Sequence, residues 1–432
     1  MADKETRKRD HLREVPPPED RKQGAADGGA AHKHKIDHMA RGPHTAVPGH
    51  VARKDVPFEC VALLLQGGGA LGAYQAGVYE AMAESGLCPD WVAGISIGAI
   101  NSAIIAGNHP DKRVAKLREF WELITSHPVA GWGLGHYTAP FVRGDMMREV
   151  YNRGAAAFAL TMGAAGFFKP RMPPPFFQPD GTSEATSFYD TSELKSTLEN
   201  LIDSDRLGEE VRLSVGAVNV RLGNFVYFDS AEQRIRPEHI MASGALPPGF
   251  PAVEIEGEFY WDGGLVSNTP LQWVVQQSDQ RMDTLAFQVD LWNARGDLPR
   301  NLAEVSTRQK EIQYSSRTRA MTDQFKIQQR VRNAIADLLE KVPDAVKANA
   351  DGELLRRIAD RKVYSIVQLI YRTARYEGQS KDYEFSRLSM EEHWRAGYND
   401  TVRTLRHEEI FKRPLVSEGG VATFDVSDDG SV

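Results

Sequence analysis

The order of apolar and polar positions predicts a domain in which buried strands alternate with helices. A continuous apolar run at 60–65 is typical of a strand buried on both faces, and 91–95 and 284–291 predict two further buried strands. The first two are each followed by a glycine-containing turn and then by a helical segment, at 73–84 and 97–106. This alternation favours a three-layer α/β/α fold with a mostly parallel central sheet.

The same pattern continues in the middle of the chain. Residues 211–220 and 225–228 predict two strands separated by a short turn, which favours a hairpin at a sheet edge. Residues 240–246 and 271–277 predict short helices, and the first of them stops at Pro247-Pro248.

The C-terminal part predicts a helical extension with at least one strand. Charged, helix-forming residues at 302–339 have apolar residues at helical spacing, with Phe325 and Ile335 expected to face inward. Residues 364–371 predict a further strand. Ser389–Glu392 match a capping box, which predicts the start of a last helix.

The regular pattern is lost between 128 and 179, where apolar residues stand between glycines and prolines. Residues 155–162 form only a short apolar piece in this region. Four aromatic residues are candidates for an exposed lid or lipid-facing surface: Phe167, Phe168, Phe176 and Phe177. The alternative is that these rings pack onto the domain as part of its core.

Composition divides the chain into four parts. Residues 1–55 are rich in charged residues, Pro and Gly and poor in aromatics, which predicts a disordered tail. Residues 56–295 hold the strand–helix pattern and are expected to form the main domain. We expect 296–412 to form an extension packed on that domain, and 413–432 to form a polar, mobile tail.

Charge and cysteine content narrow the classes of protein. The 432 residues carry a net charge of −7 with a pI near 6.0, which argues against nucleic acid as a partner. Only Cys60 and Cys88 are present, so a disulfide framework is excluded and a cytoplasmic location is expected. No signal peptide is visible and no apolar stretch is long enough to span a bilayer, so any membrane contact is expected to be peripheral.

The candidate nucleophile is Ser96. It lies in Gly94-Ile95-Ser96-Ile97-Gly98, which matches the G-x-S-x-G elbow between a buried strand and a buried helix. Gly94 and Gly98 leave room for close packing of strand and helix. The N-terminus of the helix directs partial positive charge at the hydroxyl and at an oxyanion beside it. The alternative is a small-residue turn without a catalytic role.

A glycine-rich loop precedes this elbow. Gly67-x-Gly69-x-x-Gly72 formally satisfies the dinucleotide fingerprint, and Asp90 stands near the expected place of a ribose-binding acid. In a dinucleotide fold, however, that acid ends the second strand, whereas Asp90 precedes it. We therefore interpret the Gly67–Ala70 loop as a source of backbone N–H groups for a negative oxygen near Ser96.

A serine hydroxyl also needs a base, and the sequence offers two candidates. His239 is the best-placed histidine, but it lies in a predicted loop, Arg236–His239. Asp262 follows three aromatic residues and precedes Gly263 and Gly264. An aspartate acts as a base when partial desolvation raises its pKa. The alternative for Asp262 is an acid that stabilises a turn.

Three motifs in the same order make the sequence similar to the patatin-like phospholipases: Gly67-Gly68-Gly69-Ala70-Leu71-Gly72, Gly94-Ile95-Ser96-Ile97-Gly98 and Asp262-Gly263-Gly264. Residues 242–251 also resemble this family. The similarity covers roughly 58–290, and the remainder to about 406 resembles the extension of a bacterial branch.

The resemblance implies a Ser–Asp dyad without a catalytic histidine. Ser96 would be the nucleophile, Asp262 the base, and Gly67, Gly68 and Gly69 the oxyanion hole. Many members carry Arg or Lys where this chain has Leu71. If that cation binds an anionic head group, the substrate class differs here.

The expected function is hydrolysis of a phospholipid or lysophospholipid acyl ester through an acyl-enzyme, without cofactor or metal. The expected partner is the lipid or acyl-ester substrate, with peripheral membrane contact. Three alternatives remain open: a soluble esterase or acyl-thioesterase with the same dyad, a lipid-binding protein without turnover, and an oxidoreductase that binds NAD or FAD at Gly67–Gly72.

Overall fold

The computed structural model describes residues 56–126, 144–276, 281–374 and 376–425. All of these residues belong to one compact unit, Thr45–Val432. The predicted disordered tail at 1–55 lies outside the described residues.

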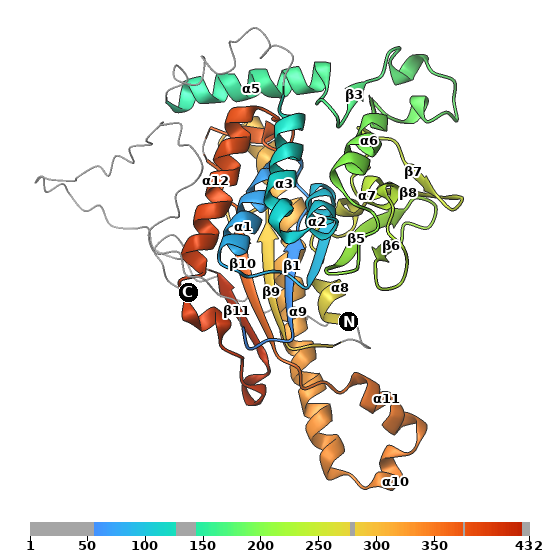
Figure 1. Ribbon diagram of the computed structural model, residues 1–432, viewed down its shortest axis with the longest axis vertical. Coiled ribbons are helices and arrows are strands. Elements are labelled where there is room, and N and C mark those ends of the chain that lie inside the picture. The colour runs from blue at the N-terminus through green and yellow to red at the C-terminus, as the bar shows by residue number, and fades with distance from the viewer. Residues whose placement is uncertain (1–55, 127–143, 277–280, 375, 426–432) are drawn as a thin grey trace, which may run out of the picture. The chain divides into compact units, whose positions relative to one another are not determined.

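A mostly parallel sheet forms the centre of this unit (Figure 1). Within the described residues it has nine strands, in the order β11-β10-β9-β1-β2-β5-β8-β7, with β6 paired to β5. The mutually parallel strands are β1 (Cys60–Leu65), β2 (Trp91–Ile95), β5 (Arg212–Asn219), β9 (Thr284–Asp290), β10 (Tyr364–Ile370) and β11 (Val421–Asp425). Strands β6 (Phe225–Asp229) and β8 (Glu258–Asp262) run antiparallel to β5, and β7 (Val253–Ile255) runs antiparallel to β8. The predicted α/β fold and the predicted 211–228 hairpin are confirmed.

Each face of the sheet has its own apolar core, because successive strand residues point to opposite sides. Val61, Leu63 and Leu65 of β1 pack with α1 (Ala73–Glu84), α2 (Ile97–Ala106) and α3 (Pro110–Ile124). Cys60, Ala62 and Leu64 pack with α8 (Leu271–Gln276) and with Phe325 of α9 (Leu302–Lys341). Burial on both faces explains the continuous apolar sequence of this strand.

The last helix, α12 (Arg387–Thr404), packs against α1 through a pair of glycines (Figure 1). A Cβ atom on Gly77 would lie 1.9 Å from the Trp394 carbonyl oxygen, and one on Gly397 would lie 2.0 Å from the Tyr74 carbonyl oxygen. Only glycine permits so close an approach of the two backbones. The C-terminal extension is therefore fixed against the first helix of the main domain.

The remaining elements complete the layers and their connections. The other described helices are α5 (Asp145–Met162), α6 (Ser192–Leu201), α7 (Pro237–Ser243), α10 (Asp344–Lys347) and α11 (Ala350–Ile358), and a small separate sheet pairs β3 (Lys169–Pro170) with β4 (Tyr189–Asp190). Single 3-10 turns are η1 (Gly69–Gly72), η4 (Pro175–Phe177), η5 (Glu184–Thr186), η6 (Gly263–Leu265), η8 (Gly378–Ser380), η9 (Glu408–Phe411) and η10 (Val416–Glu418).

Figure 1 shows α5 beyond the ends to which the parallel strands point, and α10 and α11 at the end of α9 that lies away from the sheet. Among the described helices, none has both the length and the apolar character needed to cross a membrane.

Helix α5 lies where the sequence pattern predicts only a short apolar piece. Its buried positions include Arg148 and Asn152, whereas Met146, Met147 and Val150 are exposed. In the first half of the helix, two polar side chains therefore face the domain while apolar side chains face solvent, which departs from the usual amphipathic pattern; the second half buries Ala156 and Ala159. The expectation of irregular structure here is wrong for that reason.

Two expectations for the C-terminal part also differ from the structure. Helix α12 begins at Arg387, because the Ser386 side chain accepts a hydrogen bond from the Ser389 N–H and caps the helix. Ser389 thus lies inside the helix and does not open a capping box.

The segment expected as a mobile tail contains β11, which pairs with β10 over Tyr364–Gln368. Pairing with a neighbouring strand stabilises this edge, and local composition does not reveal such pairing.

Candidate active site

Ser96 follows β2 directly and precedes α2 at the carboxyl end of the parallel strands. Its backbone has φ 57° and ψ −126°, a conformation that costs energy for a residue with a side chain. A Cβ atom on Gly94 would lie 2.2 Å from the Gly98 carbonyl oxygen, and one on Gly98 would lie 2.3 Å from the Leu65 carbonyl oxygen. Both glycines are therefore required for the tight strand–helix turn that presents the Ser96 hydroxyl.

A neighbouring serine holds this turn in place. The Ser96 N–H donates to Ser243 Oγ over 2.9 Å, and the Ser243 hydroxyl donates to the Gly216 carbonyl oxygen over 2.6 Å. Ser243 ends α7 and Gly216 lies in β5, so two further elements fix the orientation of Ser96. Sequence reasoning assigned no role to Ser243, because a serine at the end of a short helix carries no distinctive signal.

Asp262 lies beside Ser96 because β8 runs antiparallel to β5. Its carboxyl group is buried, with 2% of the residue exposed, and Oδ1 accepts a 2.7 Å hydrogen bond from the Gly264 N–H. Burial raises the pKa of Asp262 to about 7, although the nearby Ser96 side chain and the hydrogen bond from the Gly264 N–H act in the opposite direction. A carboxyl group that titrates near neutrality is suited to accept and return a proton.

The two glycines after Asp262 allow this close packing. A Cβ atom on Gly263 would lie 2.6 Å from the Gly216 carbonyl oxygen. One on Gly264 would lie 3.1 Å from Asp262 Oδ1 and 3.2 Å from Asn268 Oδ1. The short Asp262–Gly264 motif is therefore needed for both the strand contact and the carboxylate hydrogen bond.

The glycine loop presents two backbone amides without protein partners. The Gly67 N–H donates to Asn268 Oδ1 over 3.1 Å, so this amide is already engaged. The Gly67 carbonyl oxygen accepts from Asn268 Nδ2 at 3.0 Å and from Trp292 Nε1 at 2.9 Å. Within the described residues, the N–H groups of Gly68 and Gly69 have no protein acceptor, and both residues line the same cavity as Ser96.

Gly72, the third glycine of the Gly67-x-Gly69-x-x-Gly72 pattern, has a packing role. A Cβ atom on Gly72 would lie 2.6 Å from Ile97 Cγ1 and 3.0 Å from the Trp121 ring. Gly72 therefore permits the start of α1 to pack against α2 and α3. Sequence reasoning missed Asn268 and Trp292, although Asn268 stands in the same turn region as Asp262 and Trp292 follows the predicted strand at 284–291.

A cavity of about 290 Å³ opens beside the Ser96 hydroxyl. Its walls are mainly apolar, and they include Ile97, Ile100, Leu160, Phe167, Phe168, Leu246, Phe250 and Phe385. Trp292, Tyr314, Asp382 and Tyr383 line it from the side of the C-terminal extension. This volume and lining are suited to an apolar ligand chain.

The four aromatic candidates for an exposed surface divide into two pairs. Phe167 and Phe168 are only 6% and 5% exposed, and they line the cavity within a cluster of aromatic rings. The expectation that these two are exposed is therefore wrong, because they pack against Phe250 and Phe385. Phe176 and Phe177 are 82% and 78% exposed, as expected.

His239 lies in helix α7 and not in the predicted loop. Its Nδ1 accepts a 2.9 Å hydrogen bond from the Arg236 N–H, and its ring contacts Phe228. Burial, together with the nearby Arg236 charge, lowers the pKa of His239 to about 4. His239 does not line the Ser96 cavity, so the structure gives it a packing position away from the candidate nucleophile.

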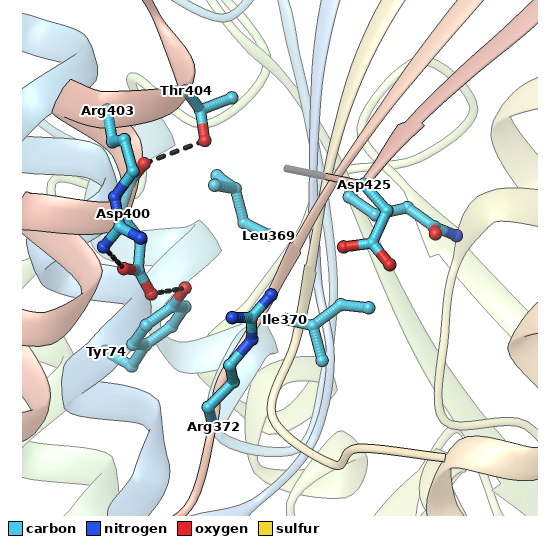
Figure 2. A pocket seen from close by; sticks show the side chains of 9 residues that line it. Tyr74, Leu369, Ile370, Arg372, Asp400, Arg403, Thr404 and Asp425 are labelled. Atoms are coloured by element: carbon cyan, nitrogen blue, oxygen red, sulfur yellow. Dashed lines mark hydrogen bonds and ion pairs between the residues drawn. The ribbon is translucent and has the colours of Figure 1, made fainter. Parts of the chain in front are cut away.

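Figure 2 shows a second, smaller cavity between β10, α1 and α12. The Tyr74 hydroxyl and Arg403 Nη2 donate to the Asp400 carboxylate over 2.9 Å each, and the Thr404 hydroxyl donates to the Asp400 carbonyl oxygen over 2.8 Å. The volume of about 20 Å³ has room for about one water molecule and none for an acyl chain.

The described residues do not form the dinucleotide site or a metal site. Asp90 Oδ2 accepts a hydrogen bond from the Val61 N–H near the start of β1, at the end of the sheet opposite the glycine loop. It therefore lies far from where a dinucleotide ribose would bind. Among the described residues, no group of three or more His, Cys, Asp or Glu side chains is arranged to hold a metal ion.

Solved structures show only weak likenesses to this chain. VipD from Legionella pneumophila aligns with 13% identity and a TM-score of 0.33, over 85% of this chain and 72% of VipD. A chain of the complex of SpcU with ExoU, from the type III secretion system of Pseudomonas aeruginosa, aligns with 15% identity and a TM-score of 0.25, over 71% of this chain and 61% of that one. Among curated proteins, none matches the chain.

Two family models match the sequence directly. One, described as patatin-like phospholipase, matches residues 63–274, which include the glycine loop, Ser96 and Asp262. The other, described as patatin phospholipase, matches residues 312–415 in the C-terminal extension. A patatin-like phospholipase assignment supports a lipid acyl hydrolase. The order of the motifs, the mostly parallel sheet and both matches agree, and the chain belongs to the patatin-like phospholipase family.

Proposed function

We propose that this protein is a serine acyl-ester hydrolase of the phospholipase or lysophospholipase type, with Ser96 as nucleophile and Asp262 as base. One observation supports this proposal above the others. The Ser96 side chain, on a backbone turn with positive φ, lies close enough to the buried Asp262 carboxyl group to affect its pKa, which burial raises to about 7. This pair lies in an apolar cavity large enough for part of an acyl chain.

The first half of the reaction forms an acyl-enzyme. Ser96 Oγ attacks the ester carbonyl carbon while its proton passes to the Asp262 carboxylate. The tetrahedral intermediate then collapses, and Asp262 returns the proton to the departing alcohol oxygen. The hydrogen bond from the Gly264 N–H holds the carboxylate oriented through both transfers.

The oxyanion of the intermediate needs donors that are already in place. The Gly68 and Gly69 N–H groups are suited to this role, because they line the cavity and have no acceptor within the described protein. The Gly67 N–H, included in the predicted oxyanion hole, instead positions the loop through Asn268. The N-terminus of α2, which begins directly after Ser96, adds partial positive charge at the same place.

The second half of the reaction regenerates the enzyme. Asp262 takes a proton from a water molecule that attacks the acyl carbonyl carbon. When the new intermediate collapses, the bond to Ser96 Oγ breaks, the carboxylic acid leaves, and Asp262 returns the proton to Ser96 Oγ. Every proton transfer is carried by Asp262 in this scheme. His239, with a pKa lowered to about 4 and a position outside the cavity, has no part in it.

The substrate reaches this cavity from a lipid surface in our proposal. Six exposed apolar residues, which we call the apolar rim, lie at the end of α5 and in the segment that follows it: Leu160, Met162, Met172, Phe176, Phe177 and Phe188. The Phe176 and Phe188 rings are 6.0 Å apart, and Leu160 also lines the cavity. Lys169 and Arg171 in the same segment already face acidic side chains, so attraction to anionic lipid is not the main force.

Replacement of the nucleophile is the first test. Ser96→Ala should lower the hydrolysis of p-nitrophenyl esters by at least ~10³-fold, because the covalent route is lost. Circular dichroism should remain unchanged, since the new side chain fits the same turn. Turnover at the wild-type rate by a folded Ser96→Ala protein would refute the nucleophile assignment.

The base assignment predicts a pH profile and a contrast between two variants. In the wild type, kcat/KM should rise about tenfold per pH unit below 7 and level off above it, because only the ionised Asp262 accepts the serine proton. Asp262→Asn should be nearly as inactive as Ser96→Ala, whereas His239→Ala should retain most activity. If His239→Ala were the more damaging change, the dyad would be wrong.

Stability measurements provide a control for the Asp262 variant. The folded pKa of about 7 lies above the ordinary value of 3.8, so the folded state binds a proton more tightly than the unfolded chain does. Ionisation of Asp262 therefore destabilises the wild type as pH rises from about 4 to 7. The melting temperature of Asp262→Asn, relative to wild type, should increase over this range and remain high at pH 8.

The apolar rim predicts binding to neutral lipid surfaces. Phe176→Ser combined with Phe177→Ser should weaken co-sedimentation with zwitterionic liposomes, because each buried phenylalanine contributes roughly 1.5–3 kcal/mol. Added salt should have little effect. A matched control changes two exposed leucines far from the cavity, Leu338→Ser with Leu354→Ser, and should bind as the wild type does. Unchanged binding by the phenylalanine variant would refute the docking role.

A further inference from the structure

The glycine loop is held by residues that lie outside the segment matched by the first patatin-like model, 63–274. The Trp292 indole N–H donates to the Gly67 carbonyl oxygen over 2.9 Å. The Ala70 N–H donates to the Asp382 carbonyl oxygen over 2.8 Å, and Gln66 Nε2 donates to the Tyr314 carbonyl oxygen over 3.1 Å. Three contacts from beyond β9 thus reach the Gly67–Ala70 loop and Gln66, the residue before it.

The loop needs such contacts to keep a single conformation. Glycine has more conformational freedom than any other residue, and three glycines follow one another here. Gly69 has φ +55°, and a Cβ atom on it would lie 2.0 Å from the Asp382 carbonyl oxygen. The extension therefore packs directly against the glycine loop, of which Gly68 and Gly69 line the cavity.

The contacting residues are themselves fixed by ion pairs. Lys381, with 1% of its side chain exposed, donates to Glu311 Oε1 and Thr373 Oγ1 over 2.8 Å each, and its Nζ lies 5.1 Å from the centre of the Trp292 ring. Lys310 Nζ donates to both Asp382 carboxylate oxygens over 2.9 Å. Helix α9 and the segment around η8 therefore form one unit beside the loop.

From these contacts we propose that the C-terminal extension, together with Trp292, positions the oxyanion-binding amides of Gly68 and Gly69. Trp292 is then a positioning residue, which acts on the reaction through the Gly67 carbonyl. The inference rests on the proposed acyl hydrolase function. It assigns the extension an indirect part in the reaction, because the contacts that hold the glycine loop from Trp292, Tyr314 and Asp382 come from outside 63–274.

The test removes one hydrogen bond and keeps the aromatic ring. Trp292→Phe should lower kcat for ester hydrolysis by about 10-fold or more with little change in KM, a smaller loss than the ~10²-fold or greater cost of deleting an oxyanion donor. Its affinity for an alkyl trifluoromethyl ketone, which forms an oxyanion adduct with serine, should fall by a similar factor. Affinity for the methyl ketone of equal chain length, which forms no such adduct, should stay the same.

Two companion variants separate positioning from a general effect on folding. Trp273→Phe removes an indole N–H that donates to Ser214 and Asp229, outside the cavity, and should leave kcat and both ketone affinities unchanged. Lys310→Gln breaks the partly exposed ion pair to Asp382 and should lower kcat and trifluoromethyl ketone affinity in the same direction as Trp292→Phe, by a smaller factor.

The outcomes distinguish failure of the positioning role from failure of the proposed acyl hydrolase function. Suppose that the wild type hydrolyses esters and prefers the trifluoromethyl ketone. If Trp292→Phe and Lys310→Gln then show the wild-type kcat and the wild-type ketone preference, the positioning role is wrong and the acyl hydrolase function stands. Equal loss of affinity for both ketones would also overturn it, because that result indicates a change in cavity shape. If the wild type itself shows neither hydrolysis nor ketone preference, both proposals fail.

Discussion

The burial of Asp262 against the Ser96 hydroxyl is the constraint on which the candidate site depends. A carboxyl group in this position loses its contact with water, and its pKa rises to about 7. The hydrogen bond from the Gly264 N–H and the nearby Ser96 side chain prevent a still larger rise. The group is thus able to change its protonation state near neutral pH, at a cost in stability that the surrounding sheet must offset.

The order of strands explains how two residues 166 positions apart meet at this point. Strand β2 carries Ser96 at its carboxyl end, β5 lies next to it, and β8 runs back along β5 to deliver Asp262. A Cβ atom on Gly263 would lie 2.6 Å from the Gly216 carbonyl oxygen and 3.2 Å from the Ile95 side chain, so a glycine here lets the end of β8 pack close to β5 and to the residue before Ser96. On the other side of β1, β9 leads to Trp292 and β10 to the segment that contacts the glycine loop. The extension therefore continues the same sheet and reaches the same cavity.

Strong local patterns in the sequence predicted the sheet and the serine turn, whereas the pairing of Ser96 with Asp262 follows from the family resemblance and stays a prediction. The elements that the sequence did not predict are those whose local pattern of apolar and polar residues is misleading. Helix α5 buries Arg148 and exposes Met146, and β11 is a half-buried edge strand. The engagement of the Gly67 N–H by Asn268 depends on residues 201 positions apart in the chain, and no local pattern reveals it. Phe167 and Phe168 were misplaced because a wall of a cavity and an exposed loop have the same composition.

The central claim is that Ser96 is a nucleophile activated by Asp262, and covalent labelling tests it most directly. Incubation of the full chain with an alkyl fluorophosphonate, followed by digestion and mass mapping, should place a single phosphonyl adduct on Ser96 with loss of fluoride. The labelling rate should rise with pH through about 7, as Asp262 ionises. A protein that remains unlabelled, or that carries the adduct on another residue, would contradict this account.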